Sequence, residues 1–264
     1  MQDLIILIPH YNNLLDLKES IKSIVETIPV DILIVDDGSS EKPNQQEIEA
    51  FYKNGNVFIE LLDTNVGIEN ALNAGLSFIE SKGYKYIGRL DCGDLNLPNK
   101  YRKQLEYLEQ NPETFLLGTW ADMVDMEGNL LYTLEHPTAD TEIKNRMYLN
   151  SMFVHPSVIF RTEVIDLIGK YPTKYKAAED YAYFFEISKK LKVENLPEAL
   201  LLYKMDPNSI SSTKRKLQVK NRIKIIWSHF HLGFYPLYGL IRNVMLLFMS
   251  RNLTTFMKKH VKKS

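Results

Sequence analysis

The feature that constrains the fold most is an alternation of short apolar runs with helical segments over the first part of the chain. Residues 4–9 read Leu-Ile-Ile-Leu-Ile-Pro and residues 31–35 read Asp-Ile-Leu-Ile-Val. Such continuous runs are typical of parallel strands covered on both faces. Residues 16–28 between them carry apolar side chains at helical spacing. The order strand-helix repeats to about residue 91, which predicts an α/β fold with a doubly wound, mostly parallel sheet flanked by helices.

The later elements are predicted from the same patterns. We expect a helix from 99 to 109, a strand from 115 to 124 and a hairpin turn at 127–129. A strand from 153 to 161 is interrupted at Pro156, and a closing strand runs from 196 to 205.

Composition limits the class of protein. The chain has 264 residues, 45% of them hydrophobic, which suffices for one large domain with an appendage. The single cysteine, Cys92, excludes a disulfide framework and fits a reducing compartment. We expect it to pack rather than to act as a nucleophile, because nearby carboxylates raise a thiol pKa. We also expect neither a signal peptide nor a membrane span, since no run of about 18 apolar residues occurs.

Charge is unevenly distributed along the chain. The net charge is −1, yet residues 207–264 contain twelve Lys and Arg and no Asp or Glu. The rest therefore holds 20 bases and all 33 acids, a net charge of −13. This division predicts an acidic body and a basic tail that contacts something anionic.

Candidate functional side chains follow the predicted strands. Pro9, Asp37 and Asp91 all fall at strand C-termini, so the sheet should gather them along one edge, where open α/β sheets bind ligands. Asp37 there could accept hydrogen bonds from a base or ribose. No Gly-x-Gly-x-x-Gly follows the first strand, which counts against a dinucleotide-binding Rossmann domain.

The segment 89–94 carries the densest charge. Asp91 and Asp94 lie three residues apart on a predicted turn and can hold a divalent cation together with substrate phosphates. Arg89 could contact a phosphate or offset the charge of the acids. The alternative is a surface turn capped by Asp and Gly.

Four short motifs occur in order over residues 4–110. They are Ile8-Pro9-His10-Tyr11-Asn12, Val35-Asp36-Asp37-Gly38-Ser39, Asn65-Val66-Gly67 and Arg89-Leu90-Asp91-Cys92-Gly93-Asp94. In this order they resemble the inverting family 2 glycosyltransferases, which have the GT-A fold of nucleotide-diphospho-sugar transferases. The resemblance implies that a nucleotide-sugar donor lies over these loops. The implied donor-binding residues are Pro9, Tyr11, Asn12, Asp37, Gly67, Arg89 and Asp91, with Pro9 and Tyr11 at the base and Asp37 at the uracil or ribose.

The resemblance also implies a cofactor, Mn²⁺ or Mg²⁺. The family usually has Asp-x-Asp-Asp, and here the third position is Gly93. Two arrangements stay open: Asp91 and Asp94 hold the cation together, or the diphosphate supplies most of its ligands.

A second acidic centre is Glu179-Asp180, at the start of a predicted helix. Alone, this pair is an acidic helix start favoured by the macrodipole. The resemblance implies instead that both are catalytic, with Asp180 as the general base that takes the acceptor proton. His155 lies in a His-Pro-Ser segment that resembles one beneath the family's sugar site. A structural hydrogen bond and a substrate contact both stay open for His155.

The sequence divides into a predicted catalytic domain, 1–212, and a basic amphipathic helical tail, 213–264. The domain comprises a nucleotide-binding half, 1–110, and an acceptor half, 111–212. Aromatic, Leu, Met and Lys/Arg residues without acids are typical of a helix in a membrane interface, and Pro236 should break the tail into helices. The alternative is packing on the acidic body or on a second subunit, as in a homodimer. Nucleic acid is not an expected partner.

These observations and the resemblance predict transfer of one sugar from a nucleotide-diphosphate donor, with UDP favoured. The acceptor would be a glycan or lipid-linked glycan in capsule, lipopolysaccharide or other surface polysaccharide synthesis. The expected location is cytoplasmic and peripheral, on the inner face of the cell membrane. One rival is a donor-binding scaffold protein. Another is a sugar nucleotidyltransferase, which would need a glycine-rich basic loop after the first strand.

Overall fold

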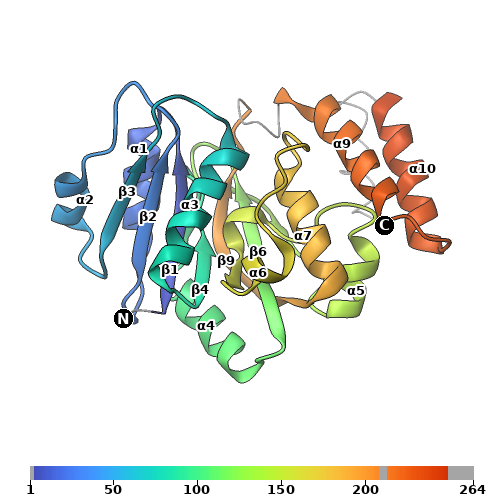
Figure 1. The fold of residues 1–264 in the computed structure, drawn as a ribbon, viewed down its shortest axis with the longest axis horizontal. Coiled ribbons are helices and arrows are strands. Elements are labelled where there is room, and N and C mark those ends of the chain that lie inside the picture. The colour runs from blue at the N-terminus through green and yellow to red at the C-terminus, as the bar shows by residue number, and fades with distance from the viewer. Residues whose placement is uncertain (1–2, 208–212, 249–264) are drawn as a thin grey trace.

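The structure is a computed structural model that describes residues 3–207 and 213–248. Its strands form one sheet in the order β3-β2-β1-β4-β8-β6-β9-β5, and β7 pairs with β6. Helices lie on both faces of this sheet (Figure 1).

The strands are β1 (Leu4–His10), β2 (Asp31–Asp36), β3 (Val57–Leu61), β4 (Tyr86–Arg89), β5 (Leu95–Asn96), β6 (Thr114–Val124), β7 (Leu130–Leu134), β8 (Ile159–Arg161) and β9 (Lys192–Lys204). The helices are α1 (Leu14–Lys22), α2 (Gln45–Phe51), α3 (Ile68–Lys82), α4 (Lys100–Gln110), α5 (Asp140–Arg146), α6 (Val164–Ile168), α7 (Glu179–Lys190), α9 (Arg215–Ser228) and α10 (Phe234–Phe248).

The first half confirms the predicted parallel sheet. β1 pairs in parallel with β2 and β4, and β2 pairs in parallel with β3. β1 is buried on both faces: Ile5 and Leu7 join the core under α3, and Ile6 and Ile8 join the core under α1 and α4. α3 packs close to the sheet, because a Cβ at Gly75 would lie only 2.3 Å from Leu7 Cδ1.

The second half is mixed. β8 runs antiparallel to β4 and β6, whereas β9 runs parallel to β6. The interruption predicted at Pro156 is present as a 3-10 turn at residues 155–157, and the strand predicted for 153–161 is confined to the three residues of β8. The turn forms because Ser157 directs both its N–H and its Oγ to the carbonyl of Val154, at 2.9 and 2.8 Å.

The C-terminal helices α9 and α10 pack against each other and lie beside α7 and α5 (Figure 1). α9 buries Ile225 and Ile226 in the main core. The predicted break at Pro236 is wrong, since the helices separate at residues 229–233 and Pro236 lies within the first turn of α10. A proline fits there because a first-turn N–H has no helical partner. Within 3–207 and 213–248, no helix is long and apolar enough to cross a membrane. Residues 208–212 and 249–264, which include part of the predicted tail, lie outside the described chain.

Candidate active site

Three parallel strands end together at one edge of the sheet. At the end of β1, the buried His10 Nδ1 lies 2.7 Å from Asp36 Oδ1 at the end of β2. The next residue, Asp37, donates its N–H to the carbonyl of His10 at 2.8 Å. These bonds hold the two loops together, and Pro9 and Asp37 lie at the same edge of the sheet, as the strand pattern predicts.

Asp37 shapes the loop that leads into α3. Its Oδ1 accepts the N–H of Val66 at 2.7 Å and its Oδ2 accepts the N–H of Gly67 at 3.0 Å. Burial raises the pKa of Asp37, although both amide bonds oppose that shift. Gly67 is required because its φ is +94°, a conformation that L side chains rarely adopt. A carboxylate has about four lone-pair sites, so Asp37 keeps acceptor capacity for a ligand.

These loops enclose a cavity of about 480 Å³. Four of the predicted donor-binding residues line it: Pro9, Tyr11, Asp37 and Gly67. Asn12, the other residue predicted in this loop, does not line the cavity. Its Oδ1 accepts hydrogen bonds from the N–H and the hydroxyl of Ser40 at 2.9 and 3.0 Å, which connects the two loops. The remaining lining residues are His10, Asn65, Val66, Ile68, Glu69, Ala71, Lys176, Ala177 and Lys214.

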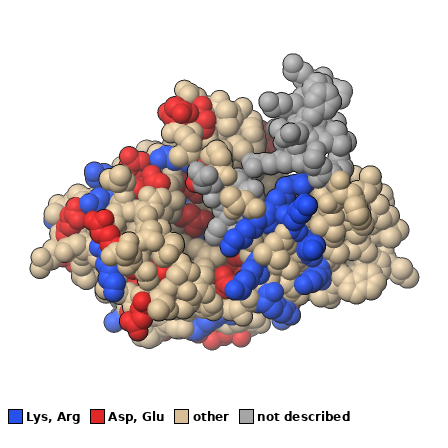
Figure 2. Space-filling view, turned by 90° about the horizontal axis from the view of Figure 1, so that it is seen from above, with Lys and Arg blue, Asp and Glu red and all other residues tan. Residues whose placement is uncertain are grey.

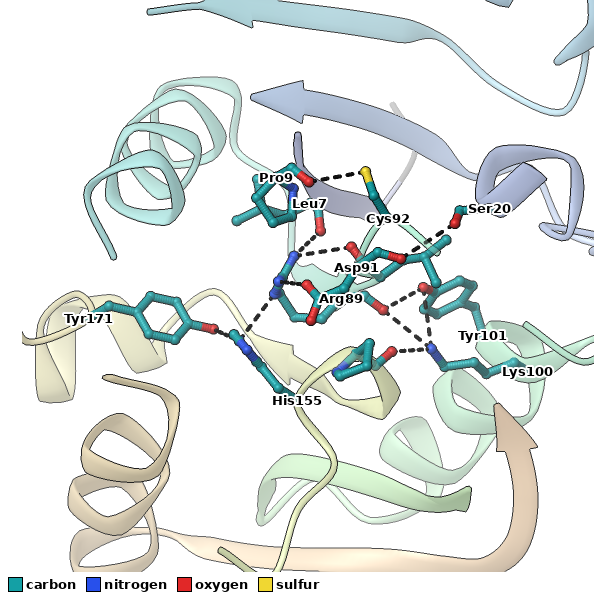
Figure 3. A network of polar contacts seen from close by, with 12 residues as sticks. Leu7, Pro9, Ser20, Arg89, Asp91, Cys92, Lys100, Tyr101, His155 and Tyr171 are labelled. Atoms are coloured by element: carbon teal, nitrogen blue, oxygen red, sulfur yellow. Dashed lines mark hydrogen bonds and ion pairs between the residues drawn. The ribbon is translucent and has the colours of Figure 1, made fainter. Parts of the chain in front are cut away.

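Arg89 is fully buried at the end of β4 (Figure 3). Its Nη2 pairs with Asp91 Oδ1 at 2.5 Å, and its Nη1 donates to the carbonyl of Leu7. Its Nε lies 3.3 Å from His155 Nε2. Every guanidinium nitrogen therefore contacts the protein. Of the two roles expected for Arg89, these contacts support the offsetting of acid charge rather than a direct phosphate contact.

The two predicted metal ligands differ in exposure and in hydrogen-bond partners. The side chain of Asp91 is 34% exposed, and its Oδ2 has no hydrogen bond within the described residues. Asp94 is 5% exposed and its Oδ1 accepts the N–H of Lys204 at 3.0 Å. Burial, reinforced by Asp91, raises the pKa of Asp94 well above its usual range. No cluster of three or more His, Cys, Asp or Glu side chains suited to a metal occurs in the described chain.

His155 belongs to a buried polar network with Arg89 and Tyr171. Its Nε2 lies 2.9 Å from the hydroxyl of Tyr171 and accepts from Arg89, which assigns the ring proton to Nδ1. Burial and the Arg89 charge lower the pKa of His155 to about 4, so the ring is neutral at pH 7. Of the two roles left open for His155, these contacts support the structural hydrogen bond.

The acidic pair at the start of α7 divides into a buried and a more accessible carboxylate. Glu179 is 7% exposed, and burial and the Asp180 charge raise its pKa to about 8. Its Oε2 has no hydrogen-bond partner among the described residues. The raised pKa of Glu179 favours its protonated, uncharged form, so Asp180 is the better candidate to take a proton. Asp180 is the less buried of the two.

Asp91 and Asp180 face the same network. Both carboxylates partly oppose the lowering of the His155 pKa, which requires both to lie near that ring. Both also influence the pKa of the Tyr171 hydroxyl, which burial raises. Asp91 and Asp180, which are distant in the sequence, therefore lie within electrostatic range of one buried ring.

Three lysines at or near the cavity were not among the residues predicted from the sequence. Lys176 and Lys214 line the cavity. The buried Lys100 donates to the carbonyl of Pro156 at 2.7 Å and to Asn96 Oδ1 at 2.9 Å, and burial lowers its pKa to about 7. Lys100 thereby connects β5 to the 155–157 turn, and it also donates to the carbonyl of Arg89 at 3.2 Å (Figure 3). Lys214 lies in the basic run 214–216, and no motif in the sequence connects that run to the cavity.

Comparison with solved structures defines the class. S. aureus TarS in complex with UDP-GlcNAc matches with a TM-score of 0.64 and 16% identity, over 90% of this chain and 69% of that chain. A longer TarS structure, of which this chain covers 41%, gives a TM-score of 0.65. The mannosyltransferase PcManGT from Pyrobaculum calidifontis, in complex with GDP-Man and Mn²⁺, gives 0.63 at 12% identity, over 94% and 70% of the two chains. The fold is the predicted GT-A fold.

The model of glycosyl transferase family 2 matches residues 5–169, and the chain belongs to that family. An uncharacterized glycosyltransferase of Methanocaldococcus jannaschii, MJ1057, is 28% identical over 221 residues, which are 81% of this chain and 75% of that protein. An Escherichia coli UDP-Gal:alpha-D-GlcNAc-diphosphoundecaprenol beta-1,3-galactosyltransferase is 23% identical over 253 residues, which are 94% of this chain and 90% of that protein.

Proposed function

We propose that this family 2 glycosyltransferase moves a single sugar, with inversion, from a UDP-sugar to a glycan or lipid-linked acceptor. The observation that carries the proposal is the arrangement of two charge centres beside one cavity. Asp91 and Asp180 lie near the same buried ring, and the cavity of Pro9, Tyr11 and Asp37 opens at the same sheet edge. An in-line displacement needs charge on both sides of the sugar.

The roles follow from the protonation and exposure of each group. Asp180 takes the proton of the acceptor hydroxyl as the new bond forms, because a free hydroxyl is a poor nucleophile at neutral pH. Glu179 stays protonated beside it and adds no repulsive charge. Arg89 holds the Asp91 carboxylate in place through the ion pair between Nη2 and Oδ1. Asp37 and Tyr11 hold the nucleoside.

The donor and acceptor classes rest on the named relatives. The E. coli relative is named for UDP-Gal and a diphosphoundecaprenol-linked acceptor, and TarS binds UDP-GlcNAc. These names favour a UDP-hexose or UDP-N-acetylhexosamine here, with a lipid-linked acceptor of surface polysaccharide synthesis. Among the residues lining the cavity, none belongs to a glycine-rich phosphate loop, which disfavours the nucleotidyltransferase alternative.

The residues present fit a divalent cation only in part. Asp91 offers the open Oδ2, whereas Asp94 is turned toward β9. The structural neighbour PcManGT is solved with Mn²⁺. Mn²⁺ or Mg²⁺ would therefore be held by Asp91 and the donor diphosphate together, an arrangement typical of Mg²⁺ sites. When bound, the ion supplies positive charge for the departing diphosphate.

A thermal-stability screen of nucleotide sugars, with and without Mn²⁺, tests the donor assignment. A donor at 100 times its dissociation constant should stabilise the fold by about 2.7 kcal/mol, which corresponds to roughly 5–10 °C in Tm. We expect the largest shift with a UDP-sugar, a smaller shift in EDTA, and none with NAD. Equal shifts for every nucleotide, or no shift for any UDP compound, would contradict the donor assignment.

Membrane attachment through the C-terminal helices is part of the same proposal. α10 and the turn before it expose large apolar side chains, with Phe234 at 74% and Phe248 at 86%. The segment from 207 onward carries twelve bases and no acid. Exposed apolar residues flanked by cations favour the anionic inner face of the cell membrane, where each nearby cation adds about 1 kcal/mol.

Liposome sedimentation checks this attachment. We expect the chain to bind vesicles with anionic lipid at low salt, and the variant Phe234→Ser/Phe248→Ser to bind at least tenfold more weakly. The matched control is Leu15→Ser on α1, a residue that is also strongly exposed. Unchanged binding by the double variant, or a stable homodimer that buries both phenylalanines, would refute the membrane assignment.

A further inference from the structure

Two lysines from distant segments line the same cavity. Lys176 precedes α7, and Lys214 immediately precedes α9. Both are exposed, and within the described residues neither forms an ion pair. Among the residues that line the cavity, these two are the permanent cations. Uncompensated cations around a concave surface attract an anionic ligand.

The opposite wall of the cavity is acidic. Asp37 and Glu69 are each 4% exposed and lie at the β2 and α3 side. The N–H groups of Val66 and Gly67, which directly precede α3, already donate to Asp37. A phosphate would meet repulsion from these two carboxylates. Figure 2 shows acidic surface inside a hollow of this face and a run of Lys and Arg side chains on the side nearer α9.

α9 fixes the position of both lysines. The buried Asn221 of α9 donates its Nδ2 to the carbonyl of Lys176 at 2.8 Å. One residue on, the Arg222 guanidinium lies 5.8 Å from the centre of the Tyr181 ring of α7. With Ile225 in the core, α9 is held against the loop that leads into the acidic pair. A helix assigned from the sequence to a membrane-binding tail therefore supports one wall of the donor cavity.

We propose that Lys176 and Lys214 bind the diphosphate of the donor, with the nucleoside directed toward Tyr11 and Asp37. This deepens the proposed function and rests on it. The Arg89 guanidinium is buried and all of its nitrogens contact the protein. The two lysines would make the phosphate contact that the sequence had suggested for Arg89. They also match the charge of a diphosphate without a preformed metal site, so part of the affinity for UDP persists in EDTA.

Calorimetric titration with UDP, UMP and uridine in EDTA at low salt tests the assignment. We expect Lys176→Gln and Lys214→Gln each to weaken UDP binding about tenfold, because a hydrogen bond to a charged group contributes about that factor. UMP should lose less, and uridine should bind within twofold of the wild type. Lys214→Arg should retain most of the UDP affinity. The matched control is Lys220→Gln, an exposed α9 lysine that does not line the cavity.

Three outcomes are decisive. Unchanged UDP affinity in both glutamine variants overturns the lysine assignment and leaves the proposed function intact. Equal losses for UDP and uridine also overturn it, because the lysines would then support the cavity rather than bind phosphate. A wild type that binds none of the three compounds overturns the proposed function as well. Melting curves identical to the wild type establish that each variant is folded.

Discussion

Replacing Asp180 by Asn lowers turnover about 10²–10⁴-fold and leaves the affinity for UDP unchanged. The amide keeps the size of the carboxylate but cannot take a proton from the acceptor hydroxyl. Donor binding persists because the cavity of Pro9, Tyr11 and Asp37 does not include Asp180. The measurement is steady-state release of UDP together with UDP titration of the same preparation.

Glu179→Gln is the matched control for this prediction. Glu179 is protonated at neutral pH because burial and Asp180 raise its pKa to about 8. The substitution therefore preserves its charge, and we expect a loss of turnover of less than about tenfold at pH 7. Near-normal turnover in Asp180→Asn, or a larger loss in Glu179→Gln, would remove Asp180 from the role of base.

Replacing Arg89 by Met lowers the free energy of unfolding by about 3 kcal/mol. The change removes the buried partner of Asp91 and leaves the carbonyl of Leu7 without its donor. The estimate is at the low end for a buried pair, because Asp91 keeps contact with water. Turnover should also fall, since the Asp91 carboxylate loses its fixed orientation. Denaturant unfolding and UDP release are the two measurements.

Arg146→Met is the control for Arg89. Arg146 forms an exposed pair with Glu142 one helical turn away, with both side chains about half exposed. Such pairs contribute about 0.3–0.5 kcal/mol. If the two methionine variants unfold at the same denaturant concentration, Arg89 does not hold the site together as described.

Much of the nucleotide-binding half could be predicted from the sequence because its signals are local. The run 4–9 is apolar at every position, which is typical of a strand covered on both faces, and β1 is buried throughout. Asp37 and Gly67 were placed at the donor loops from short motifs, and both line the cavity.

The directions of charged side chains could not be predicted in the same way. Asp94 Oδ1 accepts a hydrogen bond from the backbone N–H of Lys204, which lies far along the chain, and no local pattern predicts that contact. Arg89 is buried because its partners come from Leu7, Asp91 and His155, which only the folded sheet brings together. A pattern in one sequence does not predict contacts between residues that are distant along the chain.

Packing of the C-terminal helices on the body was one of two alternatives, but the contact of α9 with the cavity could not be predicted from the sequence. Ile225 and Ile226 point into the core while the next residue, Trp227, is 64% exposed. The aromatic, aliphatic and basic composition of 213–264, which contains no acid, favoured a membrane-binding tail and did not indicate which residues of α9 enter the core. Asn221 and Lys214, which connect it to the cavity, carry no apolar signal at all.

The most direct test of the central claim is release of UDP by the wild-type protein from the UDP-sugar that stabilises it most. The account predicts slow hydrolysis with Mn²⁺ alone, a large acceleration with a lipid-linked acceptor, and loss of both in Asp180→Asn. A wild type that binds the donor tightly yet releases no UDP with Mn²⁺ and acceptor present would show a scaffold protein instead of an enzyme.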